Sequence, residues 1–400
     1  MVSARIYTLH FNDVAPYAII DMRDLRAPFL TLLFALGISI VNAETSLDPF
    51  VYGAFTKSAT FSVASQLGFL TEQGLNVTFS QVRLIVVPIG TSEMITLSQI
   101  PNSTFGYANL LAGGYDLLTG TVDNAVNLRF NSNETLSVVG QVDLGPDLVI
   151  AGIPNITSTQ DLRGKPLMVD AAASGYAFVL RKILSLNGLQ FGADYTFQVV
   201  GGTPTRFDFL SKGSLADGTA VFATILTYPF TALASAATPP LPILARISDF
   251  VAPFFSTALT IRTSDADPST DPTSPIIRFV AAFLAANRFL SDPANKACVI
   301  QALAVENGIT VEVADAEYAA ATDPITGEVS QVDFTPSRLG LFNVIDIRML
   351  SSGFTGAGSE FDFVSASEEG LGMLLDLRIR DAALALVKEV QSGSCPLGQT

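Results

Sequence analysis

Four short loops in the sequence combine hydroxyl, amide and glycine residues where a strand pattern gives way to a helix pattern. They are Thr56–Thr60, Asn102–Thr104, Ser174–Tyr176 and Gly201–Thr205. In open α/β sheets, ligands bind beyond the carboxyl ends of the strands, where helix N-termini offer free N–H groups and hydroxyl side chains add donors. One such loop is explained equally well as a helix cap. Four in one chain favour a shared cleft for a small polar or anionic ligand.

Charged and polar side chains near these loops offer further ligand contacts. The pair Asp123-Asn124 follows another predicted strand, and it could orient a ligand amine or ring nitrogen or simply cap the next helix. Lys57 and Arg206 could each meet an acid group, although a solvated surface position is favoured for Arg206.

Two other groups of residues have simpler interpretations beside their functional ones. Phe55, Tyr176 and Tyr228 could stack on a flat ligand, but Tyr176 also begins an apolar helical stripe and could serve packing. An acidic cluster lacks the regular spacing of a calcium loop, so we interpret it as solvated surface. Its members are Asp315, Glu317 and Asp323.

Composition excludes several classes of function. The chain has 400 residues, 49% of them hydrophobic, and a net charge of −15, which suits two or three compact units but not a nucleic-acid binder. The only histidine is His10. A mature chain beginning at Glu44 would therefore lack histidine-dependent triads and histidine metal sites. We expect no metal and no other cofactor, and the only catalysis that survives is by carboxylates such as Asp123 or Asp170.

Residues 1–43 have the features of an N-terminal extension followed by a signal peptide. Met22 opens a basic stretch, the apolar run 27–41 follows, and Val41-Asn42-Ala43 resembles a cleavage site. The run is too short for a membrane span, and a buried N-terminal helix is the alternative. The pattern predicts a secreted, extracellular protein without stable membrane insertion.

Four N-glycosylation sequons and two cysteines agree with secretion. The sequons suit surface positions of a secreted chain, and the cysteines could form one disulfide or remain free thiols. These residues are Asn76, Asn102, Asn133 and Asn155, with Cys298 and Cys395.

Residues 82–99 interrupt an otherwise regular pattern. Ser80-Gln81-Val82 is echoed by Ser98-Gln99-Ile100, and removing the segment joins a strand directly to the following loop and helix. The segment is either a translated intron or an ordinary surface insertion.

Strand, loop and helix patterns alternate along the chain, as expected for parallel α/β sheets. The helix from Tyr176 to Leu186 is the clearest, because its apolar residues recur with helical spacing between Ser174, a candidate N-cap, and Asn187-Gly188, a helix stop. The pattern divides the chain into a discontinuous first lobe, 44–154 and 251–400, and a second lobe, 155–250. Two crossovers between the lobes would form a hinge beside a cleft.

Several segments, in this order, resemble the type II periplasmic substrate-binding proteins, and within them the SsuA-like group that binds sulfonates, nitrate and pyrimidine precursors. The segments lie within about residues 48–325 and read GFLTEQGLNV, AGGYDLLTGTVDNAV, DLRGKPLMVDAAASGYAFVLRKIL, VVGGTPTRFDFL, TYPFTALA and FLSDPANKA. The resemblance implies two α/β lobes, a hinge, and a ligand enclosed between the lobes. The sequons and the intron-like segment indicate a secreted eukaryotic, fungal-like form.

Carried over by position, the resemblance also implies a set of ligand contacts. These are Phe55, Thr56, Lys57, Ser58, Asn102, Ser103, Thr104, Asp123, Asn124, Ser174, Gly175, Tyr176, Thr203 and Tyr228. The pyrimidine synthases of the group need histidine and a cysteine-rich motif, which the mature chain lacks, so we expect binding without catalysis.

The function expected from the sequence is therefore that of a secreted, monomeric protein that closes around an anionic or heterocyclic metabolite, with no transporter partner and no nucleic acid. A carboxylate-dependent enzyme on the same scaffold is one alternative. A surface or interaction protein with a vestigial cleft is the other. Ligand-induced stabilisation separates binding from the last alternative.

Overall fold

The computed structural model describes residues 46–80, 102–145, 147–266, 271–358, 360–387 and 395. The chain divides into two units, Met1–Ser46 and Leu47–Thr400, and everything below concerns the second. The expected leader (1–43) and the interrupting segment (82–99) lie outside the described residues.

The first sheet has five strands in the order β2-β1-β3-β10-β4. Its strands are β1 (Asp48–Ala54), β2 (Leu75–Ser80), β3 (Leu117–Thr121), β4 (Leu136–Asp143) and β10 (Thr257–Arg262). β1 pairs in parallel with both β2 and β3, whereas β10 runs antiparallel to β3 and β4. The three parallel strands therefore all present their carboxyl ends at one edge of the sheet.

The second sheet repeats this arrangement with the order β7-β6-β8-β5-β9. Its strands are β5 (Val149–Gly152), β6 (Lys165–Val169), β7 (Tyr195–Val199), β8 (Ala223–Leu226) and β9 (Ile243–Arg246). β6 is parallel to β7 and β8, and β5 is antiparallel to β8 and β9.

The chain passes from the first sheet to the second and back again. After β4 the chain leaves the first sheet and β5 enters the second, and after β9 it returns as β10. The lobe boundary expected at residue 155 is therefore wrong, because Val149–Gly152 pairs with β8 and β9 of the second sheet. The apolar run 147–152 carried no signal of which sheet it would join. The chain therefore passes between the lobes twice, between β4 and β5 and between β9 and β10.

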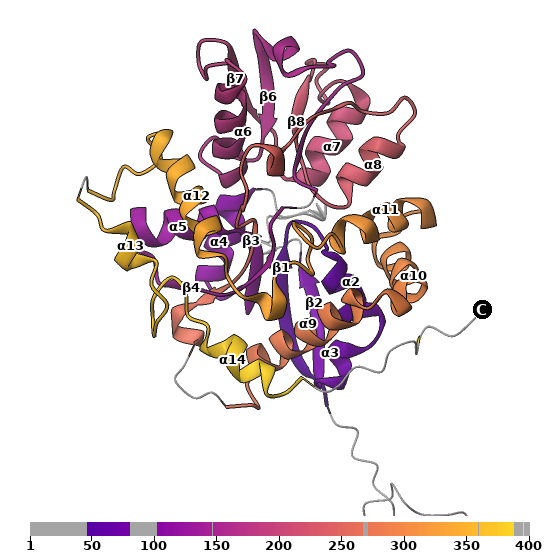
Figure 1. Ribbon diagram of the computed structural model, residues 1–400, viewed down its shortest axis with the longest axis vertical. Helices are drawn as coiled ribbons and strands as arrows, with labels where there is room; N and C mark the ends of the chain where they lie inside the picture. The colour runs from indigo at the N-terminus through magenta and orange to yellow at the C-terminus, as the bar shows by residue number, and fades with distance from the viewer. Residues whose placement is uncertain are drawn as a thin grey trace, which may run out of the picture. The chain divides into compact units, whose positions relative to one another are not determined.

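Helices cover both sheets, and Figure 1 shows the second sheet between α6 and α7. The helices of this lobe are α6 (Gly175–Leu186), α7 (Thr203–Lys212) and α8 (Phe230–Ala236). Those of the first lobe up to the crossover are α2 (Ala59–Gln66), α3 (Phe69–Glu72), α4 (Ser103–Leu111) and α5 (Val122–Val126), continued by a π-helical turn, Asn127–Asn131. After β10 come α9 (Pro275–Ser291), α10 (Lys296–Asn307), α11 (Val311–Ala321), α12 (Arg338–Leu350), α13 (Phe363–Ala366) and α14 (Arg378–Leu384).

Local sequence explains the helix that the pattern indicated best. α6 starts after Ser174, whose side chain accepts a hydrogen bond from the N–H of Ala177, and ends at Asn187. Leu180, Ile183 and Leu184 are fully buried. Gly188 follows in the left-handed conformation (φ 77°) that glycine adopts without strain.

Aromatic packing holds the first lobe together beneath its sheet. α9 is apolar over most of its circumference, which is typical of a helix buried on all sides. The ring of Phe279 stacks on Phe50 of β1 with centroids 4.5 Å apart, and Tyr52 lies 5.0 Å from Phe61 of α2. These contacts fix α2 and α9 against β1, which ends at the edge where ligands bind in such folds.

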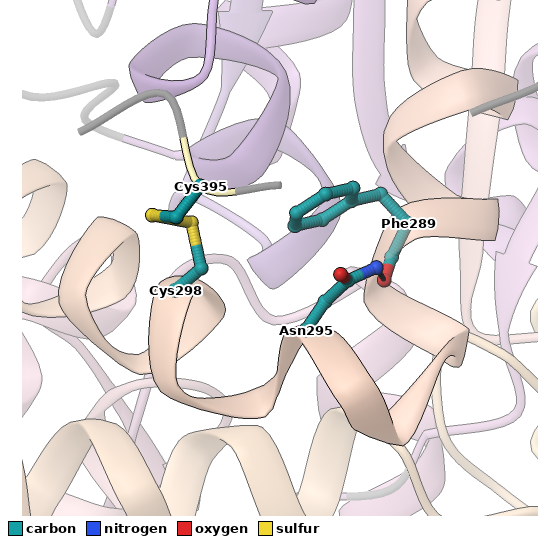
Figure 2. Close-up of a disulfide and its surroundings, with 4 residues drawn as sticks. All are labelled: Phe289, Asn295, Cys298 and Cys395. Carbon is teal, nitrogen blue, oxygen red and sulfur yellow. Dashed lines mark hydrogen bonds between the residues drawn. A yellow bond between two sulfur atoms is a disulfide. The ribbon is translucent and has the colours of Figure 1, made fainter. Parts of the chain in front are cut away.

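A disulfide joins Cys298 of α10 to Cys395, as Figure 2 shows. In the same view Asn295, just before α10, donates a hydrogen bond from its side-chain amide to the carbonyl oxygen of Phe289, at 2.9 Å. The cross-link ties a residue near the C-terminus to the first lobe. Of the helices described, none is by itself long and apolar enough to cross a membrane, although the bent pair Pro293–Asn307 and Val311–Ala321 passes on length and composition.

Candidate functional site

A pocket lies between the two lobes at the carboxyl ends of the parallel strands, with a cavity volume of about 50 Å³. Ten of its lining side chains carry hydroxyl groups, and only Asp170 and Arg206 carry a formal charge. From the first lobe it is lined by Phe55, Thr56, Ser103, Thr119, Gly120, Thr121, Asn124 and Thr257. From the second it is lined by Asp170, Ser174, Tyr176, Gly202, Thr203, Arg206, Thr227 and Tyr228.

The ends of strands and the starts of helices position these residues. Phe55 and Thr56 follow β1, Thr119–Thr121 end β3, and Asp170 follows β6. α4, α6 and α7 each begin at the pocket. The N-cap of α7 is Gly202, which has no side chain to accept a hydrogen bond from the first turn. The start of α7 therefore offers backbone polarity that a ligand can use.

Arg206 is the main cation of the site. The expectation that it would be solvated is wrong, because the residue is only 1% exposed. Its Nη1 donates to Thr224 Oγ1 and its Nη2 to Thr203 Oγ1, both at 2.9 Å. Its Nε has no hydrogen-bond partner. Among the described residues, no carboxylate oxygen lies within 4.0 Å of its nitrogen atoms, the limit for an ion pair. Burial lowers its pKa, an effect opposed by the negative charge of Asp170.

Asp170 provides the negative charge. It is 6% exposed and lies at the end of β6. Its Oδ1 accepts a hydrogen bond from the hydroxyl of Ser174 at 2.6 Å, and its Oδ2 accepts one from the backbone N–H of Ser103 at 3.1 Å. The second bond crosses from one lobe to the other, so Asp170 both lines the pocket and holds the lobes together.

Two tyrosines add neutral donors to the pocket. Burial raises the pKa of Tyr176, with the charge of Asp143 acting in the same direction, and it also raises the pKa of Tyr228. Both phenols therefore stay protonated at any physiological pH. The Tyr228 hydroxyl lies 3.4 Å from Thr257 Oγ1 on the other lobe. Neutral hydroxyl donors can hold an oxygen-rich ligand without adding charge.

The structure brings eight of the expected contacts together in this pocket. They are Phe55, Thr56, Ser103, Asn124, Ser174, Tyr176, Thr203 and Tyr228.

Six other expected contacts do not line it. Lys57 pairs with Glu306 at 2.5 Å in a neighbouring cavity, Ser58 caps α2, and Asn102 caps α4. Thr104 is exposed on α4. Ser58 and Asn102 thus serve as helix caps, which was the competing interpretation for hydroxyl and amide residues at strand-to-helix junctions.

Asp123 and Gly175, the remaining two, lie at the contact between the lobes. Asp123 is 3% exposed and accepts two hydrogen bonds from Arg348 of α12, at 2.9 and 2.5 Å. Gly175 donates its N–H to Asn124 Oδ1 at 3.3 Å, and a Cβ there would lie 2.8 Å from the Cβ of Asp123. Glycine thus allows the two lobes to approach each other.

Arg348 reaches across this contact from the C-terminal part of the chain. Besides Asp123 it donates to the carbonyl oxygen of Ala173 at 3.0 Å, and its guanidinium lies 4.3 Å from the ring centroid of Phe178. Ala173 and Phe178 belong to the second lobe. The ion pair is almost fully buried, with side chains 1% and 4% exposed.

Half of the residues that line the pocket were not among the expected ligand contacts. Thr119, Gly120 and Thr121 end a buried strand, a position that the strand-end rule could have indicated. Arg206 stands four residues into α7, and no sequence signal showed that its side chain turns back toward the helix start. Thr227 and Thr257 follow β8 and begin β10.

The acidic cluster is also different from its expected form. Glu317 is 2% exposed and therefore is not solvated surface, whereas Asp315 is exposed and Asp323 is partly exposed. Burial raises the pKa of Glu317 well above its usual range, with the charges of Asp147, Glu328 and Asp143 adding to the effect. Within the described residues, no group of three or more histidine, cysteine or acidic side chains is placed to hold a metal ion.

Comparison with solved structures identifies the architecture. The periplasmic nitrate-binding protein NrtA from Synechocystis PCC 6803 matches with a TM-score of 0.63 and 11% identity, over 85% of this chain and 89% of that one. The chain has the type II periplasmic-binding-protein fold. This fold accounts for the paired five-stranded sheets, the two crossovers and the pocket between them.

Two further structures agree with this assignment. The alkanesulfonate-binding protein SsuA from Xanthomonas axonopodis pv. citri, bound to MOPS, has a TM-score of 0.57 and 16% identity over 76% of this chain and 94% of that one. The Candida albicans CA3427 gene product, described as having the generic periplasmic binding protein fold, has a TM-score of 0.56 and 15% identity over 86% and 98%. No family model matches the sequence, and no curated protein matches it significantly.

Proposed function

We propose that this chain is a non-enzymatic binding protein whose two lobes close around a small molecule that carries an anionic group. The observation that carries the proposal is Arg206, a buried guanidinium that lines the interlobe pocket and has no carboxylate partner among the described residues. An anionic group on a ligand would supply that partner.

The energetic argument rests on the cost of burying charge. A charge removed from water costs several kcal/mol unless it is paired and fully hydrogen-bonded. Arg206 has two neutral hydroxyl acceptors and one unsatisfied Nε. A purely structural arginine at this position would be expected to have a carboxylate beside it, as Arg348 does with Asp123. The missing partner therefore points to a ligand.

The pocket is built to close by relative motion of the lobes. Its walls come from both lobes, which are connected by two crossing segments. Polar contacts such as Ser103 to Asp170 and Gly175 to Asn124 join the rims directly. The pocket has a volume of about 50 Å³. The cavity is therefore large enough to admit water or a small ligand.

The ligands of two structural neighbours agree with an oxyanion-bearing ligand. NrtA binds nitrate and the SsuA protein binds alkanesulfonates. We infer by analogy that this chain uses the same interlobe position, and that the anionic group lies against Arg206 and the start of α7. Asp123 is held by Arg348 outside the pocket, which disfavours it as a catalytic carboxylate.

We further propose that the protein is secreted, as its first 43 residues predict, and acts without a membrane transporter. Of the sequon residues, Asn76, Asn133 and Asn155 are exposed and suit glycosylation. Asn102 is less suitable, because its side chain accepts the N–H of Phe105 at the start of α4. Intact-mass measurement of the secreted protein before and after deglycosylation tests how many of these sequons carry a glycan.

Native mass spectrometry of the purified full chain tests the binding function. We expect wild-type protein to retain a bound anionic metabolite that is released on denaturation and absent from an Arg206→Met variant. Arg246→Met is the matched control, because Arg246 is exposed and outside the pocket. The proposal fails if Arg206→Met retains the same bound mass as wild type, or if neither protein carries or takes up any of a panel of small carboxylates and sulfonates.

A further inference from the structure

We propose that the ligand is a zwitterion of net zero charge, whose anionic group pairs with Arg206 and whose cationic nitrogen pairs with Asp170. This inference rests on the proposed binding function and narrows it to a class of ligand. The juxtaposition that carries it is the presence of one buried cation and one buried anion in a single small cavity.

The pocket is electrically balanced. Among its lining residues Arg206 and Asp170 are the only charged ones, and they are 1% and 6% exposed. Although both belong to the second lobe, they form no ion pair within 4.0 Å. The two charges thus face the same space and attract each other across it, but they form no direct ion pair.

Both groups keep hydrogen-bonding capacity for a ligand. The Nε of Arg206 has no partner. Each carboxylate oxygen of Asp170 accepts one hydrogen bond from the protein, from the Ser174 hydroxyl and from the Ser103 N–H. A carboxylate oxygen can accept two, so one further donor can be accommodated at each. The unused sites are a donor on one side and acceptors on the other.

A ligand with only one charge satisfies half of this site. A plain anion would pair with Arg206 but would bring a second negative charge close to Asp170 in a space of about 50 Å³. Like charges a few ångströms apart in a buried site cost several-fold more than in water. A plain amine would meet the converse problem at Arg206. A molecule with both charges neutralises both residues.

The cavity also limits ligand size. A cavity of about 50 Å³ suits a small ligand. Glycine, β-alanine and 4-aminobutyrate are short amino carboxylates that differ in chain length and therefore in the separation of their charges. Each has a matched anion without the amine: acetate, propionate and butyrate.

Isothermal titration calorimetry of the full-length protein with these six compounds tests the inference. We expect at least one zwitterion to bind ten times or more tighter than its matched anion. In Asp170→Asn this ratio should fall close to one, with the affinity for the matched anion rising because the repulsion is removed. In Arg206→Met both compounds should lose affinity. The comparison of zwitterion and anion on wild-type protein does not depend on whether any variant folds. For the variants, the midpoint of thermal unfolding reports whether they are folded.

The outcomes separate the two proposals. If the anions bind through Arg206 as tightly as their zwitterions, or if no zwitterion of the series exceeds its anion tenfold, the zwitterion inference is overturned while the binding function stands. If the ratio is unchanged in Asp170→Asn, the inference is likewise overturned. If no compound of either kind binds in a way that depends on Arg206, the zwitterion inference is overturned, and the binding function is decided by the native mass spectrum and the wider panel of carboxylates and sulfonates.

Discussion

The buried carboxylates beside the pocket predict that the protein loses stability as pH rises through neutrality. Glu328 is the clearest case, because it is completely buried and accepts hydrogen bonds from the N–H groups of Ala59 and Thr60 at the start of α2. Burial raises its pKa from 4.5 to about 7, against the effect of those hydrogen bonds. The charge of Asp143 adds to the rise.

The sign and size follow from proton linkage. Because the pKa of Glu328 is higher in the folded chain than in the unfolded chain, its favourable contribution is complete below about pH 4.5 and is lost as pH rises through 7. Between pH 5 and 8 the free energy of unfolding should fall by about 2–3 kcal/mol from this residue alone. Asp147, whose pKa is raised to about 6 chiefly by burial, acts in the same direction.

The perturbation is Glu328→Gln, which removes the ionisation while keeping the shape of the side chain. Urea unfolding at pH 5, 6, 7 and 8, followed by circular dichroism, should show a fall in the free energy of unfolding with pH that is smaller by about 2–3 kcal/mol than in wild type. The exposed Glu72→Gln is the control and should keep the wild-type decrease. An identical pH dependence in Glu328→Gln and wild type would refute the reasoning, as would a wild-type protein that is more stable at pH 8 than at pH 5.

Three further predictions concern the lobe contact and the cross-link. Gly175→Ala places a Cβ under 3 Å from Asp123 and Thr121, so binding of β-alanine should weaken at least tenfold with unchanged circular dichroism, and unchanged affinity would contradict the packing argument. Asp123→Asn leaves Arg348 buried without a carboxylate and should lower the free energy of unfolding by about 3 kcal/mol. The double variant Asp123→Asn with Arg348→Met should recover part of this stability. An unchanged free energy of unfolding in urea for Asp123→Asn would contradict the prediction. Cys298→Ser breaks the disulfide between residues 97 positions apart and should lower the free energy of unfolding by about 2–4 kcal/mol. An unchanged unfolding midpoint would count against the disulfide.

Much of the fold could be predicted because its local signals agree with one another. The helix after Ser174 has a cap, an apolar stripe and a glycine stop, and it begins and ends within one residue of the expected positions. The position of β5 could not be predicted. A short apolar strand fits either sheet, and only pairing over long distances in the sequence decides between them.

The site was harder to predict than the fold because capping and ligand binding use the same residue types. Ser58 and Asn102 stand at strand-to-helix junctions just as Ser103 and Ser174 do, yet their side chains are used by α2 and α4. The residues that matter most for charge, Arg206 and Asp170, were considered but not placed among the ligand contacts. Their burial depends on how α7 packs on β8, which the sequence of either element alone does not show.

The affinity of wild-type protein and of Arg206→Met for the same small ligand tests the central claim most directly. Calorimetric titration of the tightest-binding zwitterion of the series and of its matched anion into both proteins, with Arg246→Met as control, is the measurement. The account predicts that Arg206→Met binds at least a hundredfold more weakly than wild type while its unfolding midpoint without ligand is unchanged or higher, because a buried unpaired cation has been removed. Equal affinity in the two proteins would contradict the account.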